Sequence, residues 1–71
     1  MIADRLRSLR AERDLTQRTV ARGIDIAERQ YQFYEGGKNK PGYDILIALA
    51  DFFNVSIDYL VGRTDKQEVN R

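Results

Sequence analysis

The sequence contains no cysteine, no histidine and only one proline among its 71 residues. Without cysteine, the chain can form neither a disulfide nor a thiolate metal site. Without histidine, it lacks the commonest metal ligand and the usual general base of an enzyme. A catalytic site would have to use carboxylates, lysine or tyrosine alone, so we expect neither an enzyme nor a bound metal or cofactor.

Long apolar runs are absent as well. None approaches the roughly 18 residues that a membrane-spanning helix requires. The opening segment, MIADRLRSLR, carries charges where a secretion signal has its apolar stretch. We therefore expect a soluble, cytoplasmic protein without a membrane partner. The length suits one small domain, close to the lower limit at which a chain holds a core without disulfides or metals.

The net charge is only +1, but the charges are unevenly distributed. Residues 1–40 carry nine Lys or Arg and six Asp or Glu, whereas residues 41–71 carry three and five. A basic half beside an acidic half could orient the domain on a polyanion. A mixed, solvated surface explains the same charges more simply, so charge alone does not decide between these interpretations.

The apolar residues recur with helical spacing and an alternating strand pattern is almost absent, which predicts an all-α fold. Ile2, Leu6 and Leu9 form one apolar stripe. The helices are expected over residues 2–13, 17–23, 28–36, 44–53 and 57–61. The helix over 44–53, DILIALADFF, is apolar nearly all round, so we expect it at the buried centre of the bundle.

Polar and glycine residues mark the expected helix ends. Thr16 and Ser56 are suitable N-caps, because a hydroxyl accepts a hydrogen bond from an otherwise unpaired amide. Glycines at positions 36, 37 and 62 end the third and fifth helices. Asp14 follows the first helix, and aspartate tolerates left-handed backbone.

Only residues 25–27 separate the second and third expected helices. Helices joined by so short a turn cannot fold back antiparallel and must cross steeply, which is a helix-turn-helix arrangement. Asp25 suits a left-handed turn position, where Gly is most at ease. Alternatively, DIAE is a capping box in which Asp25 is the N-cap and Glu28 reaches back. We favour the first interpretation, because the second removes Ile26 from the core.

The third expected helix has an inner and an outer face. Tyr31 and Tyr34 fall three residues apart, so we expect them to pack in the core rather than to stack on bases. The residues expected on the outer face are Glu28, Arg29, Gln32 and Phe33. Each of these, taken alone, is also typical of an ordinary solvated helix surface.

Three segments together resemble the phage repressor and Cro-like family, also called the xenobiotic-response-element (XRE) family. They are LTQ at 15–17, YEGGKNKP at 34–41 and ADFFNVSIDYLVGRTD at 50–65. The resemblance covers residues 2–65. It implies a compact five-helix bundle of the lambda-repressor-like type over residues 1–62, and we expect residues 63–71 to form a flexible tail or linker with little to bury.

The resemblance also implies a function. Members of this family place their third helix in the major groove of double-stranded DNA, usually as a homodimer on a palindromic operator. We therefore expect a sequence-specific transcriptional regulator, a repressor, for which no small-molecule substrate is evident. Some apolar residues between 52 and 60 could remain outside the core and form the dimer seam.

The roles of individual residues follow from the resemblance. It implies base reading by Glu28, Arg29, Gln32 and Phe33. It implies phosphate binding by Gln17, Arg18, Gln30, Lys38 and Lys40. It implies a structural ion pair between Arg10 and Glu35, which would tie the first helix to the end of the third.

The sequence departs from the family at several positions. Ala27 stands where Ser or Thr usually caps the third helix, Asp25 where Gly usually forms the turn, and Tyr31 where a small aliphatic residue usually packs. Glu28 near phosphates lowers non-specific affinity, although glutamate can accept a hydrogen bond from cytosine. These departures bear on sequence preference and DNA affinity more than on the fold.

A protein-interaction module of the same fold, antitoxin-like or partner-binding, is the alternative function. Glu28, Phe33 and the weak net charge would suit it. Salt dependence separates the two hypotheses, because DNA binding falls steeply between about 50 and 200 mM salt, whereas apolar docking does not.

Overall fold

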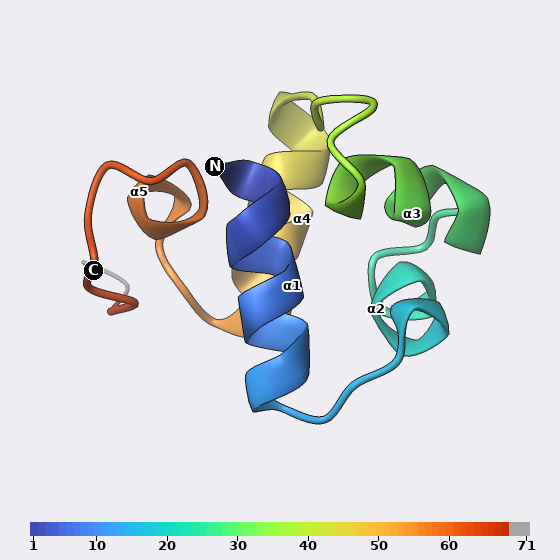
Figure 1. Ribbon diagram of the computed structural model, residues 1–71, viewed down its shortest axis with the longest axis horizontal. Helices are drawn as coiled ribbons and strands as arrows, with labels where there is room; N and C mark the ends of the chain where they lie inside the picture. Colours follow the sequence, from blue (N-terminus) through green and yellow to red (C-terminus); the bar gives the residue numbers. More distant parts are fainter. Residues whose placement is uncertain (69–71) are drawn as a thin grey trace.

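The computed structural model describes residues 1–68, which form five helices and no strand. The helices are α1 (Ile2–Glu12), α2 (Gln17–Gly23), α3 (Glu28–Glu35), α4 (Tyr43–Phe53) and α5 (Ile57–Leu60). In Figure 1, α1 runs through the middle of the molecule with α4 behind it, α2 and α3 on one side and α5 on the other. The all-α, five-helix prediction is confirmed, and the predicted helix ends differ from the observed ones by one residue at most.

All five helices contribute to one core. The fully buried large side chains are Leu6, Leu9, Val20, Tyr31, Leu49, Phe53, Val55 and Leu60. Burying a side chain of this size stabilises a fold by about 1.5–3 kcal/mol. The predicted stripe on α1 is therefore the core-facing one, and Ile2 packs against the same cluster.

Two helices begin with the expected side-chain caps. The Oγ1 atom of Thr16 accepts a hydrogen bond from the amide of Thr19 at 3.1 Å, which starts α2. The Oγ atom of Ser56 accepts one from the amide of Tyr59 at 3.0 Å, which starts α5. Such a cap contributes about 1 kcal/mol relative to alanine.

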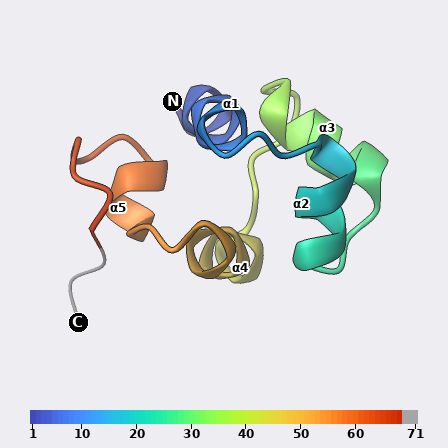
Figure 2. The same cartoon turned by 90° about the horizontal axis from the view of Figure 1, so that it is seen from below.

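α4 does not occupy the fully buried centre of the bundle, so that prediction is wrong. Leu49, Ala50 and Phe53 are buried, but residues 45–48 are half-buried and Tyr43 is 72% exposed. Figure 2 shows the reason, because α4 lies at one edge of the bundle and the other helices lie on one side of it only. None of the helices within residues 1–68 is both long and apolar enough to cross a bilayer.

α2 approaches α4 closely at Gly23. A Cβ atom at this position would overlap the ring of Phe52, so the absent side chain makes room for that ring. Glycine in a helix is less favourable than alanine by about 1 kcal/mol. The contact with Phe52 gives this glycine a structural reason that helix propensity does not supply.

Residues 63–68 contact α1 and α5, whereas we expected them to have little to bury. The carboxylate of Asp65 accepts a hydrogen bond from the guanidinium of Arg5 at 2.9 Å. The amide of Ser56 donates to the carbonyl of Gln67 at 3.0 Å, and the Gln67 side chain lies 3.3 Å from the hydroxyl of Tyr59. Residues 69–71 of the expected tail lie outside the described residues, and the domain boundary after residue 62 stays a prediction.

Candidate functional site

The turn between α2 and α3 is built around Asp25. Its φ angle of 59° is left-handed, and α3 begins at Glu28 with Ala27 as its N-cap. The left-handed interpretation of Asp25 is therefore confirmed, and the capping-box alternative is wrong. Ile26 remains packed against the core, and its amide donates to the carbonyl of Ala21 at 3.0 Å, which closes α2 across the turn.

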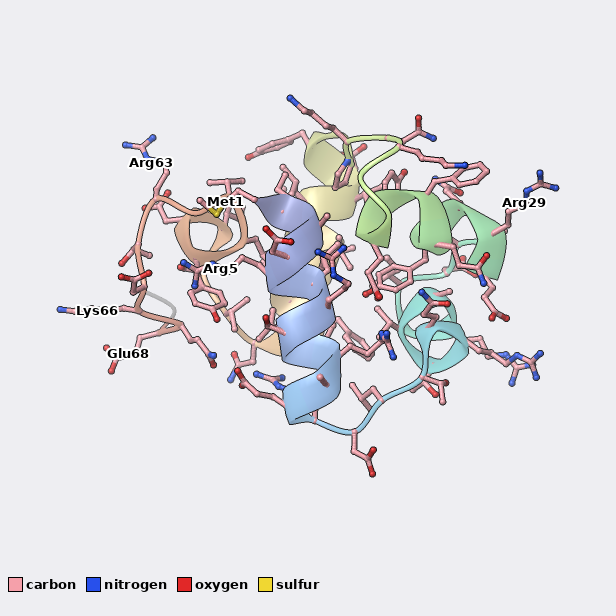
Figure 3. All side chains as sticks on the ribbon, viewed as in Figure 1. Met1, Arg5, Arg29, Arg63, Lys66 and Glu68 are labelled. Carbon is pink, nitrogen blue, oxygen red and sulfur yellow. The ribbon has the colours of Figure 1, made fainter. Side chains whose placement is uncertain are left out.

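This turn leaves one face of α3 outside the bundle. Tyr31, Tyr34 and Glu35 are buried on the inner face, as expected for the two tyrosines. Figure 3 shows Arg29 projecting from the opposite side, at the edge of the molecule farthest from α5. Among the residues of α3 that are not on its inner face, Arg29, Gln30 and Gln32 are exposed, while Glu28 and Phe33 are half-buried.

Two cations cover the ring of Phe33. The guanidinium carbon of Arg29 and the Nζ atom of Lys38 each lie 5.6 Å from the centre of the ring. Such contacts are worth about 0.5–1 kcal/mol at exposed sites. Phe33 therefore brings one residue of α3 and one residue of the following loop to a common position.

The end of α3 determines where Lys38 lies. Gly37 has a φ angle of 76°, and its amide donates to the carbonyl of Tyr34 at 3.2 Å. The amide of Lys38 donates to the carbonyl of Phe33 at 2.9 Å. This pair of bonds around a left-handed glycine is a Schellman motif, and it turns the basic loop back toward the outer face of α3.

Arg10 and Glu35 form a bidentate ion pair between α1 and the last residue of α3. The Arg10 Nε and Nη2 atoms donate to the two carboxylate oxygens at 2.8 and 3.0 Å. Arg10 also donates to the carbonyl of Leu15 at 3.0 Å, and the side-chain amide of Gln17 donates to the Glu35 carboxylate at 3.3 Å. The pair therefore joins α1, the start of α2 and the end of α3.

The environment of Glu35 shifts the pKa of its carboxyl group. Burial alone would raise this pKa, but the hydrogen bond from Arg10, the nearby Tyr31 hydroxyl, the Arg10 charge and the Gln17 side chain together outweigh burial, so the pKa lies below its ordinary value. Burial also raises the pKa of Tyr31, with a further contribution from the Glu35 carboxylate. The Tyr31 hydroxyl is buried and has no hydrogen-bond partner within residues 1–68.

The residues expected to bind phosphate fall into two groups. Lys38 and Lys40 are exposed. The other three are engaged within the protein: Gln17 with Glu35 at 3.3 Å, Arg18 with Glu28 at 3.3 Å, and Gln30 with the Tyr34 hydroxyl at 2.8 Å. A hollow of about 680 Å³ lies at the start of α2, lined by residues 14–18 with Arg10 and Glu28.

Arg7 is a supporting residue that sequence reasoning missed. Its Nη1 atom donates to the backbone carbonyl of Glu35 at 2.6 Å, so it satisfies a carbonyl at the end of α3. Arg7 precedes Arg10 by three residues, which places the two side chains on one side of a helix. That spacing was the signal that could have identified it.

A family model described as helix-turn-helix matches residues 6–60. The uncharacterized HTH-type transcriptional regulator YobD of Bacillus subtilis is 43% identical over 65 residues, which cover 92% of this chain and 58% of YobD. The cryptic phage CTXphi transcriptional repressor RstR of Vibrio cholerae is 38% identical over 65 residues, which cover 92% of this chain and 59% of RstR.

A solved structure is also similar to this chain, along its whole length. The crystal structure of a transcriptional regulator from Listeria innocua superimposes with a TM-score of 0.83 at 35% sequence identity. The match covers 100% of this chain and 64% of that one. The chain therefore spans less than two thirds of the length of the proteins to which it is similar.

The charge of Glu35 should make the stability of the protein depend on pH. Because its pKa is lowered in the folded protein, the stabilisation is complete above the ordinary value of 4.5 and is lost as the pH falls through the folded-state pKa. Glu35→Gln should lower the free energy of unfolding by about 1–3 kcal/mol at pH 7. The difference between the two proteins should shrink below pH 4.5.

Urea unfolding followed by circular dichroism between pH 3 and 7 measures this difference. Glu68→Gln at an exposed position is the matched control, and it should change the free energy of unfolding by less than about 0.5 kcal/mol. A Glu35→Gln effect that stayed constant from pH 7 to pH 3 would contradict the assigned charge.

Proposed function

Because the chain belongs to the helix-turn-helix family of transcriptional regulators, we propose that it binds DNA sequence-specifically and represses transcription by occupying an operator. It acts in the cytoplasm and performs no catalysis, since an occupied promoter is blocked without a chemical step. The observation that carries the proposal is the outer face of α3, which presents Arg29 and Gln32 to solvent beside a basic loop.

The side chains on this face match the chemistry of base edges. A major groove about 12 Å wide admits a helix. Arg29 can fork onto guanine, Gln32 onto adenine, and the ring of Phe33 can contact a thymine methyl group. Glu28 can accept a hydrogen bond from the amino group of cytosine. The four residues thus cover donors, acceptors and an apolar contact.

The basic loop and the start of α2 supply contacts to the phosphate backbone. Lys38 and Lys40 are exposed beside α3, and lysine binds phosphate with little demand on geometry. We assign Gln17, Arg18 and Gln30 to the same set, and each would have to exchange its partner in the free protein for a phosphate. Such contacts set the register of the protein on the duplex and carry no sequence information directly.

Apolar side chains on the outer side of α4 support a homodimer. Leu46 and Ile47 are half-buried, and within residues 1–68 they belong neither to the core nor to the side chains packed against it. A groove of about 340 Å³ lies beside Ile47 between α4 and α5. A second copy that covers this side holds two α3 helices about 34 Å apart, one duplex turn, on a palindromic operator.

The protein-interaction alternative loses support at Phe33. Two cations flank the ring, since Arg29 and Lys38 each lie 5.6 Å from its centre. These positively charged surroundings suit a polyanion better than an apolar partner.

Substitutions should divide the proposed interface into two classes. Arg29→Ala or Gln32→Ala should reduce discrimination between the operator and random DNA by about 1–3 kcal/mol, because each removes a base contact. Lys38→Ala or Lys40→Ala should weaken binding to all sequences and reduce the salt slope by about one, because each removes a phosphate contact.

Fluorescence anisotropy with both duplexes between 50 and 200 mM salt, the range over which phosphate contacts weaken strongly, measures both quantities. If the two classes of variant behave alike, the assignment of roles is wrong. Affinity that does not depend on salt would favour the protein-interaction alternative.

Selection of bound duplexes from a random pool tests the target and the dimer together. We expect an inverted repeat with half-site centres about 10 base pairs apart, because each copy of the protein reads one half-site. Recovery of single, unrepeated half-sites would rule out the proposed dimer and leave DNA binding itself intact.

A further inference from the structure

Glu28 is the residue through which two DNA-facing side chains are held in the free protein. Its Oε1 atom lies 3.3 Å from the Nε atom of Arg18 on α2. Its Oε2 atom accepts a hydrogen bond from the side-chain amide of Gln32, one turn further along α3, at 3.5 Å. Both carboxylate oxygens are therefore occupied by groups that the proposed function assigns to DNA.

The position of Glu28 also affects an approaching phosphate. Glu28 lines the hollow at the start of α2 together with Arg10, Gln17 and Arg18. In this hollow, Arg18 is already paired with Glu28. The negative charge of the Glu28 carboxylate therefore repels a phosphate that enters. Two unit charges about 4 Å apart near a protein surface repel by several kcal/mol before screening by salt. An acid here opposes sequence-independent binding.

We propose that Glu28 is a specificity gate, which withholds Arg18 from phosphate on unmatched DNA and releases it when a base amino group takes its place at the carboxylate. This inference rests on the proposed DNA-binding function and adds a coupling within it. Reading one base thereby creates one phosphate contact.

The exchange is chemically balanced. The amino group of cytosine or adenine donates a hydrogen bond in the major groove, so it can replace the donor that Arg18 withdraws from Glu28. Arg18 gains a charge-assisted bond to phosphate in return. Guanine O6 and N7 and thymine O4 are acceptors. At those bases the carboxylate faces another acceptor, and Arg18 stays where it is.

The pair is suited to such an exchange. The side chains of Arg18 and Glu28 are 66% and 39% exposed, so water and salt weaken their attraction. Arg10 and Glu35 are better shielded from water and salt, since their side chains are only 27% and 4% exposed. One ion pair can open when DNA arrives, while the other keeps the helices in place.

Four variants test the gate: Glu28→Gln, Arg18→Ala, the double variant and Glu68→Gln. Glu68→Gln changes the net charge by the same amount at the far end of the molecule from Arg29 (Figure 3). Anisotropy titrations use a random-sequence duplex of about 30 base pairs and the selected operator. Circular dichroism confirms that each variant is folded before it is titrated.

Glu28→Gln should raise affinity for the random duplex by roughly five- to tenfold at 0.1 M salt and steepen the salt slope by about one, because Arg18 gains a phosphate. The gain on the operator should be smaller, so the specificity ratio falls. Arg18→Ala alone should weaken binding to the operator, because the phosphate contact that Arg18 makes there is lost. In the Arg18→Ala background, Glu28→Gln should relieve the repulsion of phosphate without steepening the salt slope, because no arginine is released to a phosphate. Glu68→Gln alone should change affinity by at most about twofold.

Three results would overturn the gate while leaving the proposed function standing. Glu28→Gln could leave random-duplex affinity unchanged, could raise affinity for both duplexes equally, or could have the same effect with and without Arg18. If the unaltered protein binds neither duplex in a salt-dependent way, the proposed function fails and the gate fails with it.

Discussion

The ion pair between Arg10 and Glu35 is the contact on which the arrangement of the helices depends. It joins the middle of the bundle to the last residue of α3 and, through Leu15 and Gln17, to the start of α2. Glu35 is almost completely shielded from water. Removing one partner leaves a buried charge without its counter-ion, which is strongly unfavourable. The orientation of α3 therefore depends on both partners of this ion pair being present.

This anchoring allows one short helix to serve two purposes. The inner face of α3 contributes Tyr31 and Tyr34 to the core, while its outer face keeps polar side chains in water. The left-handed turn at Asp25 sets the direction in which α3 leaves α2. The left-handed turn at Gly37 directs the following loop back over the outer face of α3. Structural residues thus lie on one side of the helix and candidate DNA-binding residues on the other, which lets function vary without loss of the core.

Local patterns were sufficient to predict most of the fold. Apolar spacing located the five helices, and the short segment around Asp25 indicated the helix-turn-helix arrangement of α2 and α3. The exposed side of α4 was not predictable, because a helix that is apolar all round does not indicate which face its neighbours cover. Whether the protein buries that face in a dimer is a property of the assembly and not of the helix.

The polar contacts between elements were also beyond prediction. The pairing of Arg18 with Glu28, the approach of Lys38 to Phe33 and the contact of Asp65 with Arg5 depend on side-chain rotamers and on distances between helices. The spacing of apolar residues in the sequence gives neither the rotamers nor these distances. These contacts nevertheless determine which candidate residues are exposed and which are paired within the protein, so the candidate site was less predictable than the fold that carries it.

The central claim is that the outer face of α3 meets DNA. Nuclear magnetic resonance of the isotope-labelled protein, titrated with the selected duplex, tests this most directly, because chemical shifts report contact residue by residue. We predict the largest changes along the outer face of α3, at residues 28, 29, 32 and 33, and in the loop at 37–40. Changes centred on α5 and residues 63–68, with α3 unaffected, would contradict the account.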